Sequence, residues 1–209
     1  MPNILNERVE AYLMNLLPSR DPVITDMEKF AERNDVPIIG PAVARLLSLV
    51  TQISGARRIF EMGSAIGYST IWLARAAGQR AEVYYTDGNP ENAARAKEYF
   101  RRAGVAKRIR VQVGDALALL QREKGPFDMI FCDIDKHQYP EAFRIALPRL
   151  KRGGLLIADN TLWSGRVARK VESKETRGIQ KFNSMVYTSR KLYPVIVPLR
   201  DGVAICRKL

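Results

Sequence analysis

Residues 131–140, FCDIDKHQYP, place two aspartates, a lysine, the only histidine of the chain and a tyrosine within seven positions. Carboxylate, amine and imidazole groups can act as acids, bases or metal ligands. A second polar pair, Asp159-Asn160, follows the apolar run at 153–158. If the two segments end neighbouring strands, Asp133, Asp159 and Asn160 converge, and their oxygens suit Mg²⁺, Mn²⁺ or Ca²⁺. The two aspartates could instead only cap the loops that follow them.

The elements that must position these side chains follow from a regular alternation that begins at residue 57. Short apolar runs, typical of strands, alternate with segments of helical periodicity. Strands are predicted at 57–63, 81–88, 109–115, 127–135 and 153–160, and helices at 69–78, 89–105, 116–124 and 139–150. Five such alternations with nearly continuous apolar strands predict a doubly wound, mostly parallel α/β sheet.

The two ends of the chain differ from this middle part. Before residue 57 the pattern predicts a first helix, a proline-broken loop at 16–24, and helices at 26–35 and 41–53. After residue 160 it predicts a helix at 176–191 and an antiparallel hairpin around Asp201-Gly202 that closes the sheet edge. The length of 209 residues predicts a single domain, 1–209, with an N-terminal helical segment at 1–50 and an α/β core at 57–209.

Composition narrows the class of protein. Hydrophobic residues make up 46% of the chain, and no apolar run approaches the ~18 residues of a membrane span. We therefore expect a cytoplasmic enzyme or binding protein with no membrane partner. Cys132 and Cys206 lie inside apolar runs, which predicts buried thiols rather than a disulfide or a metal site.

The net charge of +12 concentrates in two basic segments, 95–110 and 164–181. Such segments attract polyanions, nucleic acid among them, but they are also typical of solvated helix faces.

An acidic residue ends each predicted strand, and in open α/β sheets ligands bind at this edge. The residues are Glu61, Asp87, Asp115, Asp133 with Asp135, and Asp159. The first turn, EMGSAIGYST, has the spacing G-x-x-x-G, whereas a nicotinamide dehydrogenase would favour G-x-G-x-x-G. Asp87 could accept both hydroxyl protons of a ribose or cap the next helix. Together these features favour an adenosine-like ligand.

Seven segments, EMGSAIGYST, TDGNP, GDA, DIDKHQY, DNTLWSGRV, ETRGIQKFN and LRDGVAICRK, carry a family resemblance in their order and spacing. They resemble the cation-dependent, S-adenosylmethionine-dependent class I O-methyltransferases of the catechol and caffeoyl-CoA group, over roughly residues 35–209. The resemblance implies a Rossmann-like methyltransferase sheet that binds S-adenosyl-L-methionine and Mg²⁺, with Mn²⁺ or Ca²⁺ as alternatives. It also implies a homodimer, for which the amphipathic N-terminal helix could form the interface or else pack on its own domain.

The same resemblance implies roles for single residues. For the cofactor, it implies that Glu61, Gly63 and Ser69 hold the methionine part and that Asp87 binds the ribose hydroxyls. It also implies that Asp115 and Ala116 border the adenine. Ile39 and Asp133 are implied to border the cofactor site as well. Asp133, Asp159 and Asn160 match the metal ligands, and Lys136 matches the catalytic base. His137 inherits no role, and the roles of Asp135 and Trp163 stay open.

The chemistry of methyl transfer fits this assignment. A phenol has a pKa of about 10, and chelation by a divalent cation lowers it. Lys136 can take the proton if the same cation depresses the pKa of its amine.

The expected reaction is methylation of one hydroxyl of a vicinal oxygen pair on a catechol-like or phenylpropanoid-like aromatic small molecule. The alternatives are O-methylation of 5-hydroxyuridine in tRNA and, more remotely, a non-catalytic RNA-binding protein on the same fold. The sequence leaves the substrate, the methylated hydroxyl and the native metal open.

Overall fold

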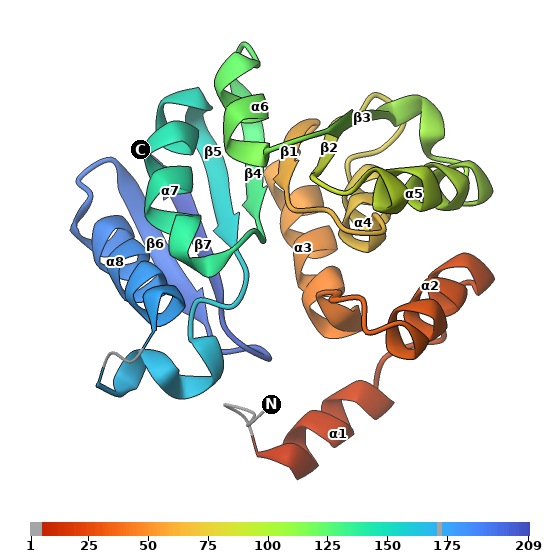
Figure 1. The fold of residues 1–209 in the computed structure, drawn as a ribbon, viewed down its shortest axis with the longest axis horizontal. Helices are drawn as coiled ribbons and strands as arrows, with labels where there is room; N and C mark the ends of the chain where they lie inside the picture. Colours follow the sequence, from red (N-terminus) through yellow and green to blue (C-terminus); the bar gives the residue numbers. More distant parts are fainter. Residues whose placement is uncertain (1–5, 171–172) are drawn as a thin grey trace.

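The computed structural model describes residues 6–170 and 173–209. Its seven-stranded sheet has the order β3-β2-β1-β4-β5-β7-β6, and β1 to β5 are parallel (Figure 1). The strands are β1 (Arg58–Met62), β2 (Glu82–Asp87), β3 (Ile109–Val113), β4 (Phe127–Cys132), β5 (Leu150–Ala158), β6 (Leu192–Val197) and β7 (Val203–Lys208). The predicted α/β class and the predicted C-terminal hairpin are confirmed, since β7 pairs antiparallel with both β5 and β6.

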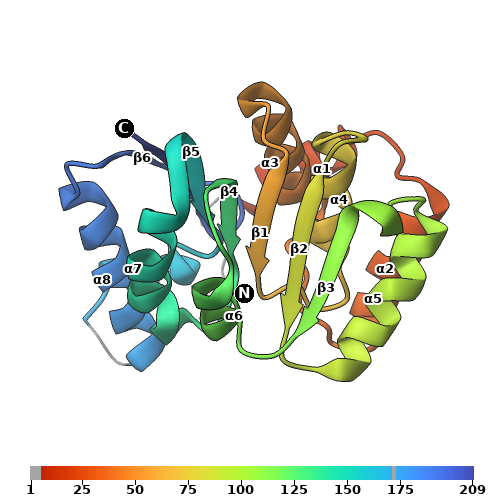
Figure 2. The same cartoon turned by 90° about the horizontal axis from the view of Figure 1, so that it is seen from above.

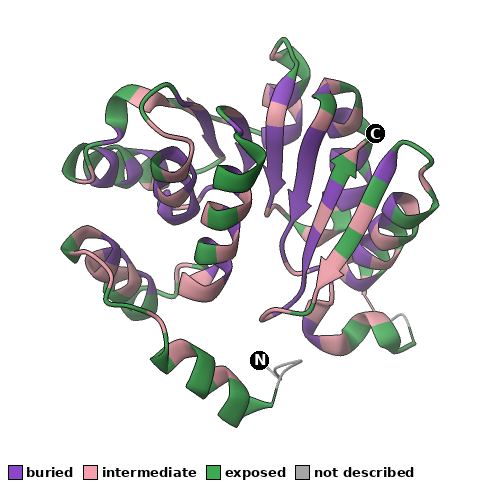
Figure 3. Cartoon of the chain, turned by 180° about the vertical axis from the view of Figure 1, so that it is seen from behind, coloured by how far each residue is buried: buried purple, intermediate pink, exposed green. Residues whose placement is uncertain are grey.

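Helices cover both faces of the sheet, as Figure 2 shows. One apolar core lies between the sheet and α2 (Pro22–Arg33), α3 (Gly40–Ser54), α4 (Tyr68–Ala76) and α5 (Pro90–Arg102). The other lies beneath α6 (Ala116–Arg122), α7 (Tyr139–Arg149) and α8 (Lys174–Thr188). Three 3₁₀ segments, η1 (Ala106–Arg108), η2 (Lys136–Gln138) and η3 (Trp163–Ala168), complete the connections. Because β1, β2 and β4 lie between two helical layers, they are almost wholly buried (Figure 3).

The N-terminal part corrects one boundary. Residues 22–24 were expected in a loop, yet α2 begins at Pro22. The Asp21 carboxylate accepts hydrogen bonds from the backbone N–H groups of Val23 and Ile24, at 3.0 and 3.1 Å. Asp-Pro is therefore a helix start here, because proline at the first helical position has no N–H to satisfy and a capping carboxylate satisfies the next two.

The first helix, α1 (Glu7–Asn15), buries none of its residues. Val9, Tyr12 and Leu13 are its exposed large apolar side chains. Cys132 and Cys206 are free and lie in the core, as predicted. None of the helices in the described chain combines the length and the apolar composition that a membrane crossing requires.

A glycine lets α8 approach the loop that carries Lys136. A Cβ on Gly178 would collide with the carbonyl oxygen of Lys136 and would lie 2.6 Å from the Cα of His137. Only a residue without a side chain therefore fits between α8 and η2. The position of Lys136 thus depends on a helix some 40 residues further along the chain.

We predict that Gly178→Ala destabilises the protein by about 1–3 kcal/mol, the usual cost of forcing an extra carbon into a packed contact. Urea unfolding of the variant against the wild type measures this change. Gly88→Ala is the matched control, because a Cβ at Gly88 meets nothing within 4 Å. Equal stabilities of the two variants would contradict the prediction.

Candidate functional site

A cleft of ≈ 730 Å³ opens at the carboxyl ends of the parallel strands. Ten of the eleven site residues predicted from the sequence line it: Ile39, Gly63, Ser69, Asp87, Asp115, Ala116, Asp133, Lys136, Asp159 and Asn160. The cleft spans the point between β1 and β4 where the strand order reverses. This is the expected place for a ligand in an open α/β sheet.

The turn after β1 brings two backbone segments into direct contact. Gly63 has a φ of 80°, in the left-handed region, and a Cβ there would lie 2.9 Å from the carbonyl carbon of Asp133. A side chain at Gly63 would therefore push the turn away from the end of β4. The first glycine of G-x-x-x-G fixes the floor of the cleft.

Asp87, at the end of β2, is held by the turns on both sides of it. Its carboxylate accepts hydrogen bonds from the backbone N–H of Ala65 at 2.9 Å and of Asn89 at 2.8 Å. The N-cap of α5 is Asn89, which accepts from Glu91 N–H at 2.8 Å. Asp87 is thus not the helix cap, and its oxygens border the cleft. Asp115, by contrast, does cap α6, through the N–H of Ala118 at 2.7 Å.

Glu61 is the one predicted site residue outside the lining, because it is completely buried beneath the cleft floor. One carboxylate oxygen, Oε2, accepts hydrogen bonds from the hydroxyls of Ser64, at 2.7 Å, and of Thr70. The other oxygen, Oε1, has no partner among the described residues. Burial raises the pKa of Glu61 to about 7. Glu61 therefore ties the glycine turn to the start of α4 from below.

The ends of β4 and β5 place two carboxylates side by side. Cys132 pairs with Ala158 in the parallel register, so the next residues, Asp133 and Asp159, share the sheet edge. Burial, and then the negative charge of Asp133, raise the pKa of Asp159. The Oδ1 atom of Asp159 is buried and has no hydrogen-bond partner within residues 6–170 and 173–209.

Asn160 and Lys136 complete this group. The amide nitrogen of Asn160 donates to Asp201 at 3.4 Å, which leaves its carbonyl oxygen available as a ligand. Lys136 Nζ donates to Asp133 Oδ1 at 2.7 Å and to the carbonyl oxygen of Ile134 at 3.1 Å. Within the described chain, no group of three or more His, Cys, Asp or Glu residues is arranged so that it could hold a metal ion. The donor set here is two carboxylates and an amide, and its unpartnered Asp159 oxygen fits a hard divalent cation.

Three features of the cleft were not anticipated as site features from the sequence. The segment 35–38 forms one wall, and the hairpin turn contributes Arg200 and Asp201. Arg200 Nη1 donates to the carbonyl oxygen of Ile38 at 3.0 Å, across 162 positions of sequence. No local sequence motif predicts the contact between Arg200 and Ile38, because the pair Asp201-Gly202 predicts only a turn.

The structure also locates the three residues to which the sequence assigns no definite role. Trp163 and Asp135 line the cleft, whereas His137 is exposed and does not.

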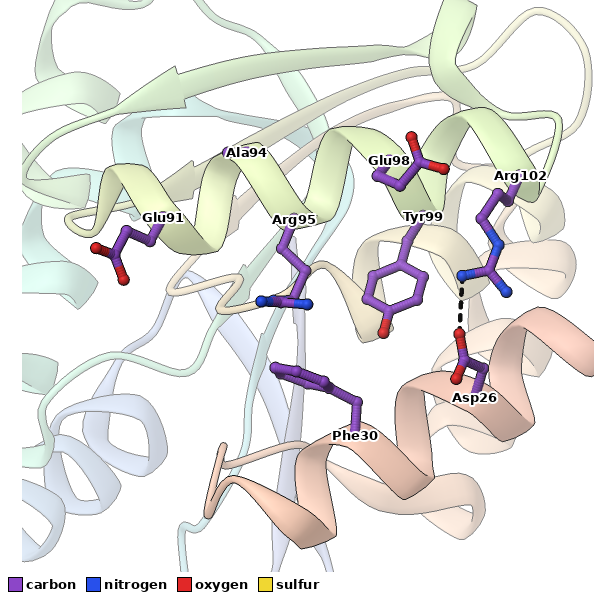
Figure 4. A pocket seen from close by; sticks show the side chains of 8 residues that line it. All are labelled: Asp26, Phe30, Glu91, Ala94, Arg95, Glu98, Tyr99 and Arg102. Carbon is purple, nitrogen blue, oxygen red and sulfur yellow. Dashed lines mark hydrogen bonds and ion pairs between the residues drawn. The ribbon is translucent and has the colours of Figure 1, made fainter.

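A second hollow, of ≈ 580 Å³, lies between α2 and α5 (Figure 4). Its basic side chains already have partners: Arg102 pairs with Asp26 at 2.7 Å, and Arg95 stacks on Phe30 with 3.9 Å to the ring centroid. The hollow shares no lining residue with the cleft. The cleft is therefore the candidate active site.

The chain is similar to O-methyltransferases in both sequence and structure. A family model described as O-methyltransferase matches residues 19–209. The chain is 33% identical to a catechol O-methyltransferase of Niastella koreensis, over 98% of both chains. It is 28% identical to caffeoyl-CoA O-methyltransferase 1 of Eucalyptus globulus, over 79% of this chain and 72% of the relative. The structure of an O-methyltransferase from Bacillus cereus in complex with SAH superimposes with a TM-score of 0.88, at 28% identity and 97% coverage of both chains.

We predict that Glu61 makes stability fall as pH rises. Its pKa is about 7 in the folded protein and 4.5 for the ordinary group, so folding favours the protonated form. The stabilisation is fully present below pH 4.5 and is lost as pH rises to about 7, by on the order of 3 kcal/mol. Urea unfolding without cofactor or cation should show this decline in the wild type relative to Glu61→Gln. The exposed Glu32→Gln is the control, and parallel pH profiles of wild type and Glu61→Gln would contradict the prediction.

Proposed function

Because the chain belongs to the O-methyltransferase family, we propose that this S-adenosylmethionine-dependent O-methyltransferase methylates one hydroxyl of a vicinal pair on a catechol-like aromatic molecule, with the aid of a divalent cation. The observation that carries the proposal is the convergence of Asp133, Asp159 and Asn160 at one end of the cleft. Relatives named for catechol and for caffeoyl-CoA support the substrate class.

We propose that these three side chains hold Mg²⁺ or a similar cation. The cation would lower the pKa of a chelated phenol from about 10 and fix two adjacent oxygens. Because the Asp159 carboxylate is buried beside Asp133, its charged form is unfavourable without a compensating positive charge. The buried oxygen of Asp159 therefore supports a cation-dependent enzyme.

The cofactor would occupy the rest of the cleft. Asp87 offers carboxylate oxygens to the ribose, Asp115 and Ala116 form the wall expected beside the adenine, and Gly63 permits close approach of the methionine part. Ser69 and Ile39 line the same cleft. Glu61 would act from beneath, by fixing the turn that contains Gly63.

Lys136 is the proposed base. Its amine lies 2.7 Å from Asp133 and therefore next to the proposed cation ligands. A positive charge bound there would lower the pKa of the amine, and the neutral amine can accept the phenol proton at Nζ. Gly178 and α8 hold the lysine in this position.

For the first basic segment, contacts within the protein favour the small-molecule substrate over tRNA. All five arginines of segment 95–110 make contacts within the protein: Arg95 with Phe30, Arg101 with Glu98, Arg102 with Asp26, Arg108 with backbone carbonyls, and Arg110 with Glu82. Their charge is thus partly compensated before any polyanion approaches. The homodimer stays a prediction, and the exposed apolar residues of α1 fit such an interface.

We predict that labelled S-adenosylmethionine transfers its methyl group to a catechol in the presence of Mg²⁺, and that excess EDTA abolishes the transfer. Asp159→Asn should reduce kcat/KM at least about 100-fold, because it removes the charge of a proposed ligand and keeps its shape. Asp26→Asn, in the second hollow, is the control and should keep its activity. Methylation of total tRNA but not of catechols would favour the tRNA alternative, and activity in EDTA would refute cation dependence.

We also predict that Lys136→Met lowers kcat by about 10²–10⁴-fold at neutral pH, the usual contribution of a general base. The loss should shrink as pH rises toward the pKa of the phenol, since hydroxide then supplies the base. The pH profile of kcat measures both effects, with the exposed Lys97→Met on α5 as control. A loss that stays constant with pH would instead indicate a structural role for the lysine.

A further inference from the structure

Arg200 stands in the mouth of the cleft in an unusual backbone conformation. It follows β6 and has a φ of 52°, in the left-handed region that favours glycine. The backbone conformation at this position favours glycine, but the residue there has a long, charged side chain. Arg200 is half-buried, lines the cleft and donates one guanidinium hydrogen bond, from Nη1, to Ile38.

Arg200 is one of few basic residues in a mostly acidic cleft. The cleft lining contains seven aspartates, Asp35, Asp87, Asp115, Asp133, Asp135, Asp159 and Asp201, but only two basic residues, Lys136 and Arg200. Lys136 is paired with Asp133. Among the described residues, no carboxylate oxygen lies within the 4.0 Å of an ion pair from Arg200. A guanidinium has five N–H donors, so several remain for a ligand.

The position of Arg200 relates it to the acceptor rather than to the adenosine end of the cleft. The next residue, Asp201, accepts the hydrogen bond from Asn160, one of the proposed cation ligands. The positive charge of Arg200 also acts on Asp159. Arg200 further borders an adjoining hollow of ≈ 160 Å³, whose lining is apolar apart from Glu10 and Arg200 itself and includes Leu13, Met14 and Ile39. An aromatic ring bound near Asp159 and Asn160 could thus direct a substituent toward Arg200.

We propose that Arg200 binds a carboxylate on the acceptor, so that the preferred substrates are catechols with an acidic substituent, such as dihydroxybenzoates or dihydroxycinnamates. This inference rests on the proposed function and names the substrate class of the same site. A carboxylate matches the planar fork of a guanidinium and can accept two parallel hydrogen bonds. In a cleft lined by aspartates, an anionic acceptor needs such a partner to offset repulsion.

The test compares 3,4-dihydroxybenzoate with 3,4-dihydroxybenzamide, which has nearly the same shape and no charge. Arg200→Gly should lower kcat/KM for the acid about 10–100-fold more than for the amide, the range for a hydrogen bond to a charged group. Glycine suits the left-handed backbone, so this variant should fold, and its melting temperature checks that. Arg200→Lys keeps the charge and should retain part of the preference for the acid. Calorimetric titration should show the same loss in binding of the acid.

Other results overturn the inference. Equal losses for acid and amide would mean that Arg200 acts only through its contact with Ile38. A raised KM for S-adenosylmethionine with both acceptors would assign the guanidinium to the cofactor. Unchanged selectivity in Arg200→Gly would exclude the carboxylate contact while the proposed function stands. If the wild type methylates neither catechol, the proposed function fails and the inference falls with it.

Discussion

The parallel pairing of β4 with β5 is the constraint on which the site depends. It places Asp133 and Asp159 at the same edge, and burial of Asp159 makes their joint negative charge costly. Such an arrangement is a poor way to stabilise a fold, because two carboxylates without a shared partner repel each other. It becomes favourable when a positive charge is bound between them. The unpartnered oxygen of Asp159 fits the proposed cation, which would add to the charge that Lys136 already supplies at Asp133.

Two glycines fix the segment that carries this chemistry. Gly63 allows the β1 turn to touch the backbone at Asp133, and Gly178 allows α8 to touch the backbone at Lys136 and His137. The loop after β4 is therefore held from the sheet side and from the helical side at once. Catalytic groups need such support, since small displacements of a reacting group cost much of the rate. Both glycines sit where no side chain fits, and Gly63 also has a left-handed φ that favours glycine.

The sequence was sufficient for the parts of the site that rest on local patterns. Strand ends, their acidic residues and the hairpin follow from apolar runs and turn residues, and these predictions agree with the fold. The start of α2 differs from the prediction, because Asp21-Pro22 is typical of a loop but Asp before Pro is also a capping pattern. The burial of Glu61 could not be predicted, since strand-end carboxylates usually face the ligand. The contact between Arg200 and Ile38 joins segments 162 positions apart and has no local signature.

The net charge of a protein does not by itself indicate that its surface binds polyanions, because the contacts of each basic side chain also matter. The net charge of +12 and the run at 95–110 suggest a polyanion-binding surface, but the arginines of that run stack on an aromatic ring, pair with carboxylates or bind backbone carbonyls. A charge that is already paired contributes little to recognition, because its partner must first be displaced. Arg200 is the opposite case: it is a single cation, but it lies in an acidic cleft without an ion-pair partner in the described chain. Its side chain lines the same cleft as Asp159 and Asn160, where the acceptor is expected to bind. In the proposed function, selectivity depends more on this one arginine than on the excess of basic residues over the surface.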